Sequence, residues 1–191
     1  MSQFLGPVHH RMFEKIRALD LRTDQLLTGH AALVTEVDTA CGRLAEGSLE
    51  EIIDTDNIHG WLAGQVAVAE CRHAHAVHAL LTAGEDPEHL KQKQQAAPSD
   101  CGADLKQAFF LLDGCFLDGM PCDHAMRAQE NEDGTLEVVI DEKAHAAFWN
   151  LGTPVEVYEE LRFDAMEKQA KACGLKIQRR APFHYLLGRE V

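Results

Sequence analysis

Residues 58–83, IHGWLAGQVAVAECRHAHAVHALLTA, decide the fold of the first half of this chain. The stretch contains no proline, follows the capping pair Asp56–Asn57 and precedes Gly84, a residue type suited to a helix C-terminus. These signals predict a single helix of about 26 residues, or roughly 39 Å at 1.5 Å per residue. A helix of that length needs other helices along its sides, so the first half should be helical.

Helical spacing gives this predicted helix two chemically different sides. The ionisable residues on its aliphatic side, among Leu62, Val66, Ala69, Val77 and Leu80, are His59, Glu70 and His73. The residues that point the other way, toward solvent or another partner, are Cys71, His75 and His78. Because an isolated charge in a core costs several kcal/mol, His73 and Glu70 need partners if they are buried.

The rest of the chain completes an α+β fold. Further helices are expected over residues 7–19, 23–45, 49–54, 87–97, 103–117, 142–150 and 154–173, of which 87–97 is polar enough to be solvated. Strands are expected over residues 126–130, 135–140, 175–180 and 183–187, the first two joined by the Asn131–Gly134 turn. The sequence therefore predicts a helical unit, 1–97, and a small antiparallel sheet with helices, 98–191, which meet at Pro98–Ser99–Asp100 and pack as one body.

Composition excludes several classes of function. Thirty-one acidic residues against eighteen basic ones leave a net charge of -13, which repels nucleic-acid phosphates and anionic lipid. No apolar run approaches the roughly 20 residues of a membrane span, and the first residues show no signal sequence. We therefore expect a cytoplasmic protein with neither a nucleic-acid nor a membrane partner.

The six cysteines give no sign of a disulfide framework. None forms a Cys-x-x-Cys pair. In a reducing cytosol, an even number of cysteines does not indicate disulfide bonds. We expect small buried or half-exposed thiols. A zinc knot or an iron–sulfur cluster is disfavoured, because close cysteine pairs are missing.

The eleven histidines point to a metal instead. Glu70 lies one turn before His73, and His9 lies on the apolar side of the first predicted helix. His59 lies too far along its helix to join them. The three residues His9, Glu70 and His73 could hold iron, zinc or manganese with positions open to a ligand. A bound organic cofactor such as haem is less favoured, and a hydrogen-bonded structural histidine is the alternative.

Glu-x-x-His, the spacing used in di-iron bundles, occurs twice, at residues 70–73 and 142–145. The second copy follows a predicted strand and lies in a short helix. A ferritin-like site, which needs long inward-facing helices around both copies, is therefore disfavoured.

A second segment with several potentially reactive side chains is DGMPCDH, residues 118–124. Gly119 and Pro121 predict a tight turn from which Cys122 and His124 emerge, and residues two apart on a strand share a side. Cys122 with His124 could supply a nucleophile or a ligand pair. A turn closed by a buried cysteine explains the segment as well.

Three short segments resemble an uncharacterised bacterial family found mostly in anaerobes. They are FLGPVHH at residues 4–10, IHGWL at 58–62 and DGMPCD at 118–123. The resemblance implies that these segments belong to one cytoplasmic protein and brings no activity with it. The order helix, hairpin, helix, closing strand is also similar to the thiazoline-carboxylate hydrolase family, although none of its catalytic motifs can be placed on this chain.

The sequence leaves three functions open. The first is binding of a metal ion or small-molecule ligand between helices of the first half. The second is a small-molecule hydrolase built around Cys122 and His124, and the third is a structural or adaptor role. Two long helices in a small unit also leave apolar surface, which favours a homodimer.

Overall fold

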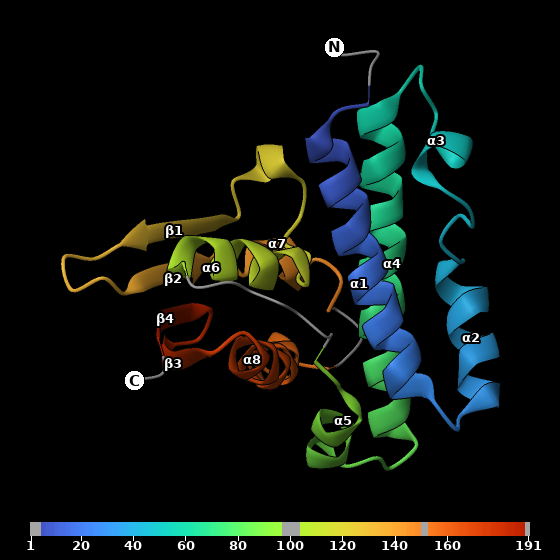
Figure 1. Ribbon diagram of the computed structural model, residues 1–191. Coiled ribbons are helices and arrows are strands. Elements are labelled where there is room, and N and C mark those ends of the chain that lie inside the picture. The colour runs from blue at the N-terminus through green and yellow to red at the C-terminus, as the bar shows by residue number, and fades with distance from the viewer. Residues whose placement is uncertain (1–4, 97–103, 150–152, 190–191) are drawn as a thin grey trace.

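The computed structural model describes residues 5–96, 104–149 and 153–189. It confirms the predicted α+β class, since a helical first half is followed by a four-stranded antiparallel sheet with helices (Figure 1). The helices of the first half are α1 (Pro7–Leu27), α2 (Ala31–Cys41), α3 (Leu49–Ile52), α4 (Ile58–Thr82), α5 (Pro87–Lys93) and α6 (Leu105–Gly114). The later elements are η1 (Pro121–Asp123), β1 (Met126–Glu130), β2 (Leu136–Ile140), α7 (Lys143–Ala146), α8 (Val155–Ala172), β3 (Leu175–Ala181) and β4 (His184–Arg189).

Helix α4 is the predicted long helix, and its ends form as the sequence indicates. The Asn57 side chain accepts a hydrogen bond from the Gly60 amide at the start. Gly84 adopts a left-handed φ of 90° just after the end, a conformation that glycine adopts without steric cost. No helix among the described residues has the length and apolar character needed to cross a membrane.

Helix α1 packs against α4 and runs in the same direction (Figure 1). Phe13 contacts Trp61 near the beginning of both helices, with ring centroids 5.9 Å apart. Thr23 contacts His73 further along. This pairing in register fixes which residues of the two helices can meet, and it separates their two ends.

The boundaries of the first two helices differ from the prediction. The sequence predicts one helix over 7–19 and another over 23–45. In the structure α1 continues to Leu27, and α2 covers only Ala31–Cys41. Thr23 does not interrupt α1, because its hydroxyl donates to the Leu19 carbonyl within the helix. The break comes at Gly29 and the end of α2 at Gly42, which both have a left-handed φ.

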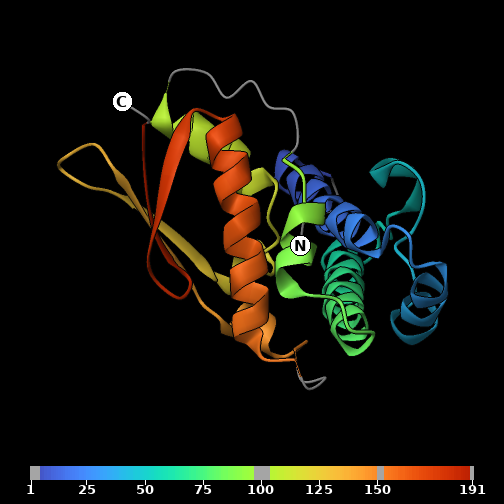
Figure 2. The same cartoon turned by 90° about the horizontal axis from the view of Figure 1, so that it is seen from below.

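The sheet has the strand order β1-β2-β4-β3 with antiparallel neighbours throughout. The predicted hairpin forms with Met126 opposite Ile140, and Gly134 adopts the expected positive φ of 77°. One face of β2, β3 and β4 is buried. Helix α8 packs along β3 and lies between the sheet and helices α1, α4 and α5 (Figure 2).

The larger hydrophobic core crosses from the first half into the second. It includes Leu26 and Leu80 from α1 and α4, Leu161 from α8 and Leu187 from β4. Most residues of α5 are exposed or half-buried, as expected for a solvated connecting helix, but Leu90 is fully buried and anchors this helix in the same core. The predicted boundary at residues 98–100 lies outside the described residues.

Candidate metal centre

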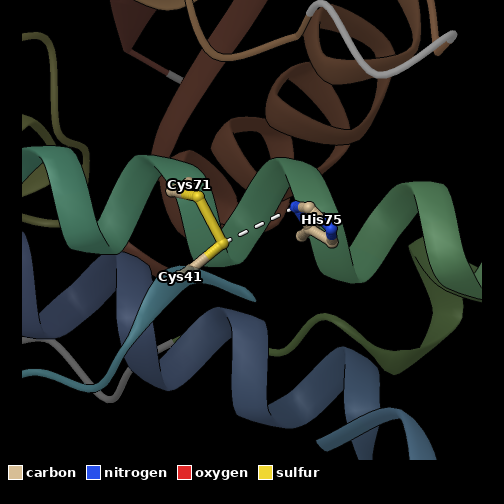
Figure 3. A group of neighbouring side chains, drawn as sticks. All are labelled: Cys41, Cys71 and His75. Carbon is tan, nitrogen blue, oxygen red and sulfur yellow. Dashed lines mark hydrogen bonds between the residues drawn. A yellow bond between two sulfur atoms is a disulfide. The ribbon is translucent and has the colours of Figure 1, made fainter. Parts of the chain in front are cut away.

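Cys41, Cys71 and His75 form a half-buried group between α2 and α4 (Figure 3). Cys41 is the last residue of α2, while Cys71 and His75 lie one turn apart on α4. Their ligand atoms all lie within 4.8 Å of one another. Among the described residues, this group of two cysteines and one histidine could hold a metal ion.

The sulfur atoms of Cys41 and Cys71 are joined in a disulfide, and Cys173 is also disulfide-bonded. The expectation that the cysteines are thiols is therefore wrong for these three. Cys41 and Cys71 are 30 residues apart in sequence, but the packing of α2 along α4 brings their Cα atoms to 5.7 Å, a usual disulfide separation. Cys115 and Cys122 are free thiols.

Arg72 positions the end of α2 that carries Cys41. Its side chain is buried on α4 and donates a hydrogen bond to Asp20 of α1 over 2.7 Å. It also forms an ion pair with Asp38 of α2 and donates to the Gly42 carbonyl. One guanidinium thus connects three helices next to the sulfur atoms, a role that its planar set of five N–H donors suits.

The side of α4 that bears Cys71 and His75 faces α2, not open solvent. The missed signal is the Cys71-x-x-x-His75 spacing, which places a thiol and an imidazole on one turn of one face. The third member, Cys41, comes from another helix, and nothing in the sequence indicates which helix packs there.

The structure does not bring together the three ligands predicted from the sequence. The His9 ring lies beside His59, with centroids 5.7 Å apart, and its Nδ1 accepts a hydrogen bond from the Gly6 amide. His73 Nδ1 lies 3.0 Å from the Thr23 hydroxyl. Residues 9 and 23 are about 21 Å apart along α1 at 1.5 Å per residue, so His9 and His73 occupy opposite ends of the α1–α4 pair. Burial lowers the pKa of His73 to about 3, which keeps its imidazole neutral.

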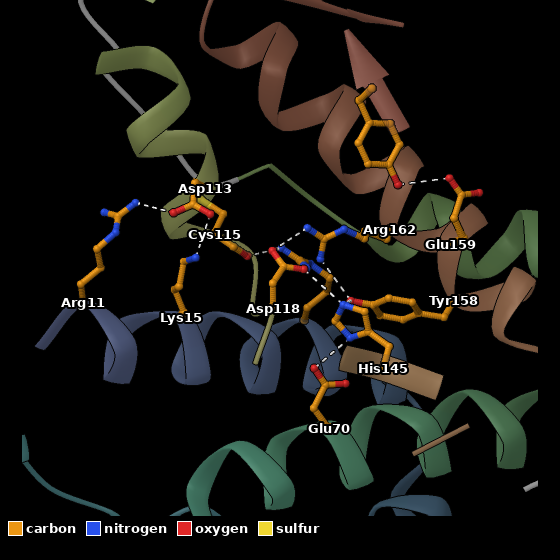
Figure 4. Close-up of polar contacts among 12 residues, drawn as sticks. Arg11, Lys15, Glu70, Asp113, Cys115, Asp118, His145, Tyr158, Glu159 and Arg162 are labelled. Atoms are coloured by element: carbon orange, nitrogen blue, oxygen red, sulfur yellow. Dashed lines mark hydrogen bonds and ion pairs between the residues drawn. The ribbon is translucent and has the colours of Figure 1, made fainter. Parts of the chain in front are cut away.

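Glu70, the third predicted ligand, belongs to a buried ion network (Figure 4). Its Oε1 lies 3.1 Å from Nδ1 of His145, so the glutamate of the first Glu-x-x-His copy meets the histidine of the second. Nε2 of His145 lies 3.2 Å from Asp118, whose other oxygen accepts a hydrogen bond from Arg162. The network connects α4, α7, α8 and the segment after α6.

The charges in this network stabilise one another. Burial by itself would lower the pKa of His145, but Glu70 and Asp118 outweigh it and raise the pKa to about 9. Burial would likewise raise the pKa of Asp118, whereas Arg162 and His145 hold it well below its usual range. At neutral pH His145 is therefore an imidazolium between two carboxylates, with a proton on each ring nitrogen.

Cys122 and His124, the predicted catalytic pair, line two different hollows. Exposed Cys122 borders a hollow of about 460 Å³ together with His59 and Phe148. His124 has a left-handed φ of 49° and borders a separate cavity beside α1. The turn through Gly119 and Met120 lines both hollows, so the hydrolase hypothesis stays a prediction without a shared site for these two side chains.

Comparison of the chain with family models, with curated proteins and with solved structures finds no match. The fold and the site together define an α+β protein with a group of two cysteines and one histidine between its first helices.

Proposed function

We propose that the protein binds a divalent metal ion, with zinc as the first candidate, through Cys41, Cys71 and His75 in its reduced form. Thiolate and imidazole are the ligands that zinc prefers, whereas manganese favours oxygen ligands. Three protein ligands leave one tetrahedral position for water or for a small-molecule ligand. This proposal keeps the predicted location between helices of the first half and replaces the predicted ligands.

The distance between Cys41 Sγ and His75 Nδ1 carries the proposal. It is 3.6 Å, and a sulfur and a nitrogen bound to one tetrahedral zinc at about 2.3 and 2.1 Å also lie about 3.6 Å apart. The His75 nitrogen therefore already lies as far from the Cys41 sulfur as two ligand atoms of one zinc ion lie from each other. Arg72 holds both helices in place, so metal binding needs no rearrangement of the backbone pairing.

Oxidation state decides whether the group can bind. A thiolate is the ligand form of cysteine, so the disulfide and the metal exclude each other. Reduction by two molecules of a cellular thiol leaves two cysteine thiols and one external disulfide, and metal binding then releases the two thiol protons. In the cytoplasm, where we expect this protein, thiol reductants favour the dithiol form.

Cobalt and zinc titrations test the proposal directly. The reduced full-length protein should bind one equivalent of Co²⁺ with sulfur-to-cobalt charge-transfer bands and the intense visible bands of a tetrahedral site. Zn²⁺ should displace the cobalt, and the oxidised protein should show neither signal. His75→Gln should weaken zinc binding at least about tenfold, and Cys71→Ser should remove the charge-transfer band of one thiolate.

Matched controls separate the site from general metal affinity. His78→Gln changes a histidine on the next turn of α4 whose Nδ1 lies 3.0 Å from the Thr153 hydroxyl, and it should leave zinc affinity unchanged. Cys115→Ser removes a thiol from another part of the fold and should also have no effect. Equal zinc affinity in the oxidised and reduced proteins, or in wild type and His75→Gln, would contradict the proposal.

A further inference from the structure

A cavity of about 270 Å³ lies between α1, the end of α6 and the turn at Gly119. It shares no residue with the candidate metal centre. The apolar part of its lining includes Val8, Met12, Met120 and Met126. Its charged part consists of Arg11, Lys15, Asp113 and Asp118. The cavity is thus a compact apolar space with charge at defined points of its wall, which is the usual composition of a ligand site.

Two cations share one carboxylate on this wall (Figure 4). Arg11 and Lys15, one turn apart on α1, each lie 2.8 Å from Asp113. Arg11 also stacks over the Phe110 ring, 3.4 Å from its centroid, which fixes the guanidinium in place. Asp113 balances only one of these two positive charges, so the other remains without a carboxylate on this wall.

The carboxylate of Asp118 does not cancel that excess. Its oxygens are bound by His145 and Arg162, and Glu70 balances only one of those two cations. Arg22 adds a further guanidinium whose charge acts on Asp118. No carboxylate of the described residues lies within ion-pair distance of Arg22, which donates to the Cys115 carbonyl instead.

The charges around the cavity add up to an excess of positive charge. The cationic groups are Arg11, Lys15, Arg22, His145 and Arg162. The anionic groups are Glu70, Asp113, Asp118 and Asp123, whose carboxylate accepts a hydrogen bond from the Met120 amide in the cavity wall. Five positive against four negative charges leave one in excess, inside a chain whose net charge is -13. Partly desolvated cations without counter-charges are costly, and an anion in the cavity would relieve that cost.

We propose that this cavity binds a small organic carboxylate with an apolar body. The carboxylate binds at Lys15 and Arg11, and the apolar body packs against the methionine side chains, which adapt to irregular shapes. The cavity volume suits a ligand of about one aromatic ring, below the size of a typical drug molecule.

Calorimetric titration of the full-length protein with benzoate and with benzamide tests this assignment. The two probes have the same shape and differ in charge. Benzoate should bind at least about tenfold more tightly than benzamide, and its affinity should fall as salt is added. Equal binding of the two probes, or no binding of benzoate, would overturn the proposal. Inorganic phosphate binding as tightly as benzoate would overturn the requirement for an apolar body.

Variants locate the binding to the cavity. Lys15→Met keeps the apolar stem and removes the charge, so it should weaken benzoate binding at least tenfold. Lys176→Met, at an exposed position of β3 away from the cavity, should not. Val8→Trp gives a second route if Lys15→Met fails to fold. It narrows the rim at a residue that is 51% exposed, leaves every charge in place and should also weaken benzoate binding. Unchanged affinity in folded Lys15→Met or in Val8→Trp would place the ligand elsewhere.

Discussion

Replacing His145 with glutamine should destabilise the protein by an amount that depends on pH. The pKa of His145 is raised from 6.5 to about 9 in the folded protein, chiefly because Glu70 and Asp118 outweigh the effect of burial. A raised histidine pKa stabilises the fold fully below the unfolded pKa, and the stabilisation is lost as pH rises through the folded pKa. At about 1.4 kcal/mol per pKa unit, the protonated imidazole contributes about 3 kcal/mol.

Removing one partner of a buried ion pair destabilises a protein by a similar amount, about 3–5 kcal/mol. The free energy of unfolding of wild type should therefore exceed that of His145→Gln by about 3 kcal/mol or more near pH 6. The difference should shrink by about 1.4 kcal/mol per pH unit between about 6.5 and 9, and then level off.

Urea unfolding of both proteins across this pH range measures the difference, in which the titrating groups that do not interact with His145 cancel. His89→Gln is a suitable control, because His89 is exposed and its ion pair with Glu85 lies on the surface. That variant should change stability by no more than about 1 kcal/mol. A wild-type-to-variant difference at His145 that stays constant from pH 6 to pH 9 would refute the assignment of an imidazolium between two carboxylates.

Three further predictions concern other residues. The double variant Cys41→Ser, Cys71→Ser removes a cross-link over 30 residues, which should cost about 3.5 kcal/mol and lower Tm by roughly 10 °C in a thermal scan without reductant. Arg72→Met leaves the carboxylates of α1 and α2 without their buried cation, so urea unfolding should show a loss of about 3–5 kcal/mol. Iodoacetamide should modify exposed Cys122 faster than Cys115, whose pKa is raised by burial, and mass spectrometry of timed samples would show the reverse order if this is wrong.

The local parts of this fold could be predicted from the sequence because their signals lie within a few residues. Asn57 and Gly84 mark the ends of α4, and Gly134 supplies the positive φ of the hairpin turn. Helical periodicity also indicated that Glu70 and His73 are buried, as the structure shows. These features depend on backbone sterics and on neighbouring side chains, which a linear pattern contains.

The partners of those buried groups could not be predicted in the same way. Periodicity assigns a residue to one side of its own helix, but it does not say which other helix covers that side or in which register. Glu70 meets His145, 75 residues away, and Cys41 meets Cys71, because α7 and α2 pack at particular points along α4. The sequence by itself determined that Glu70 and His73 of α4 need partners. Only the tertiary structure decided which they are, because that choice depends on the packing of the whole core.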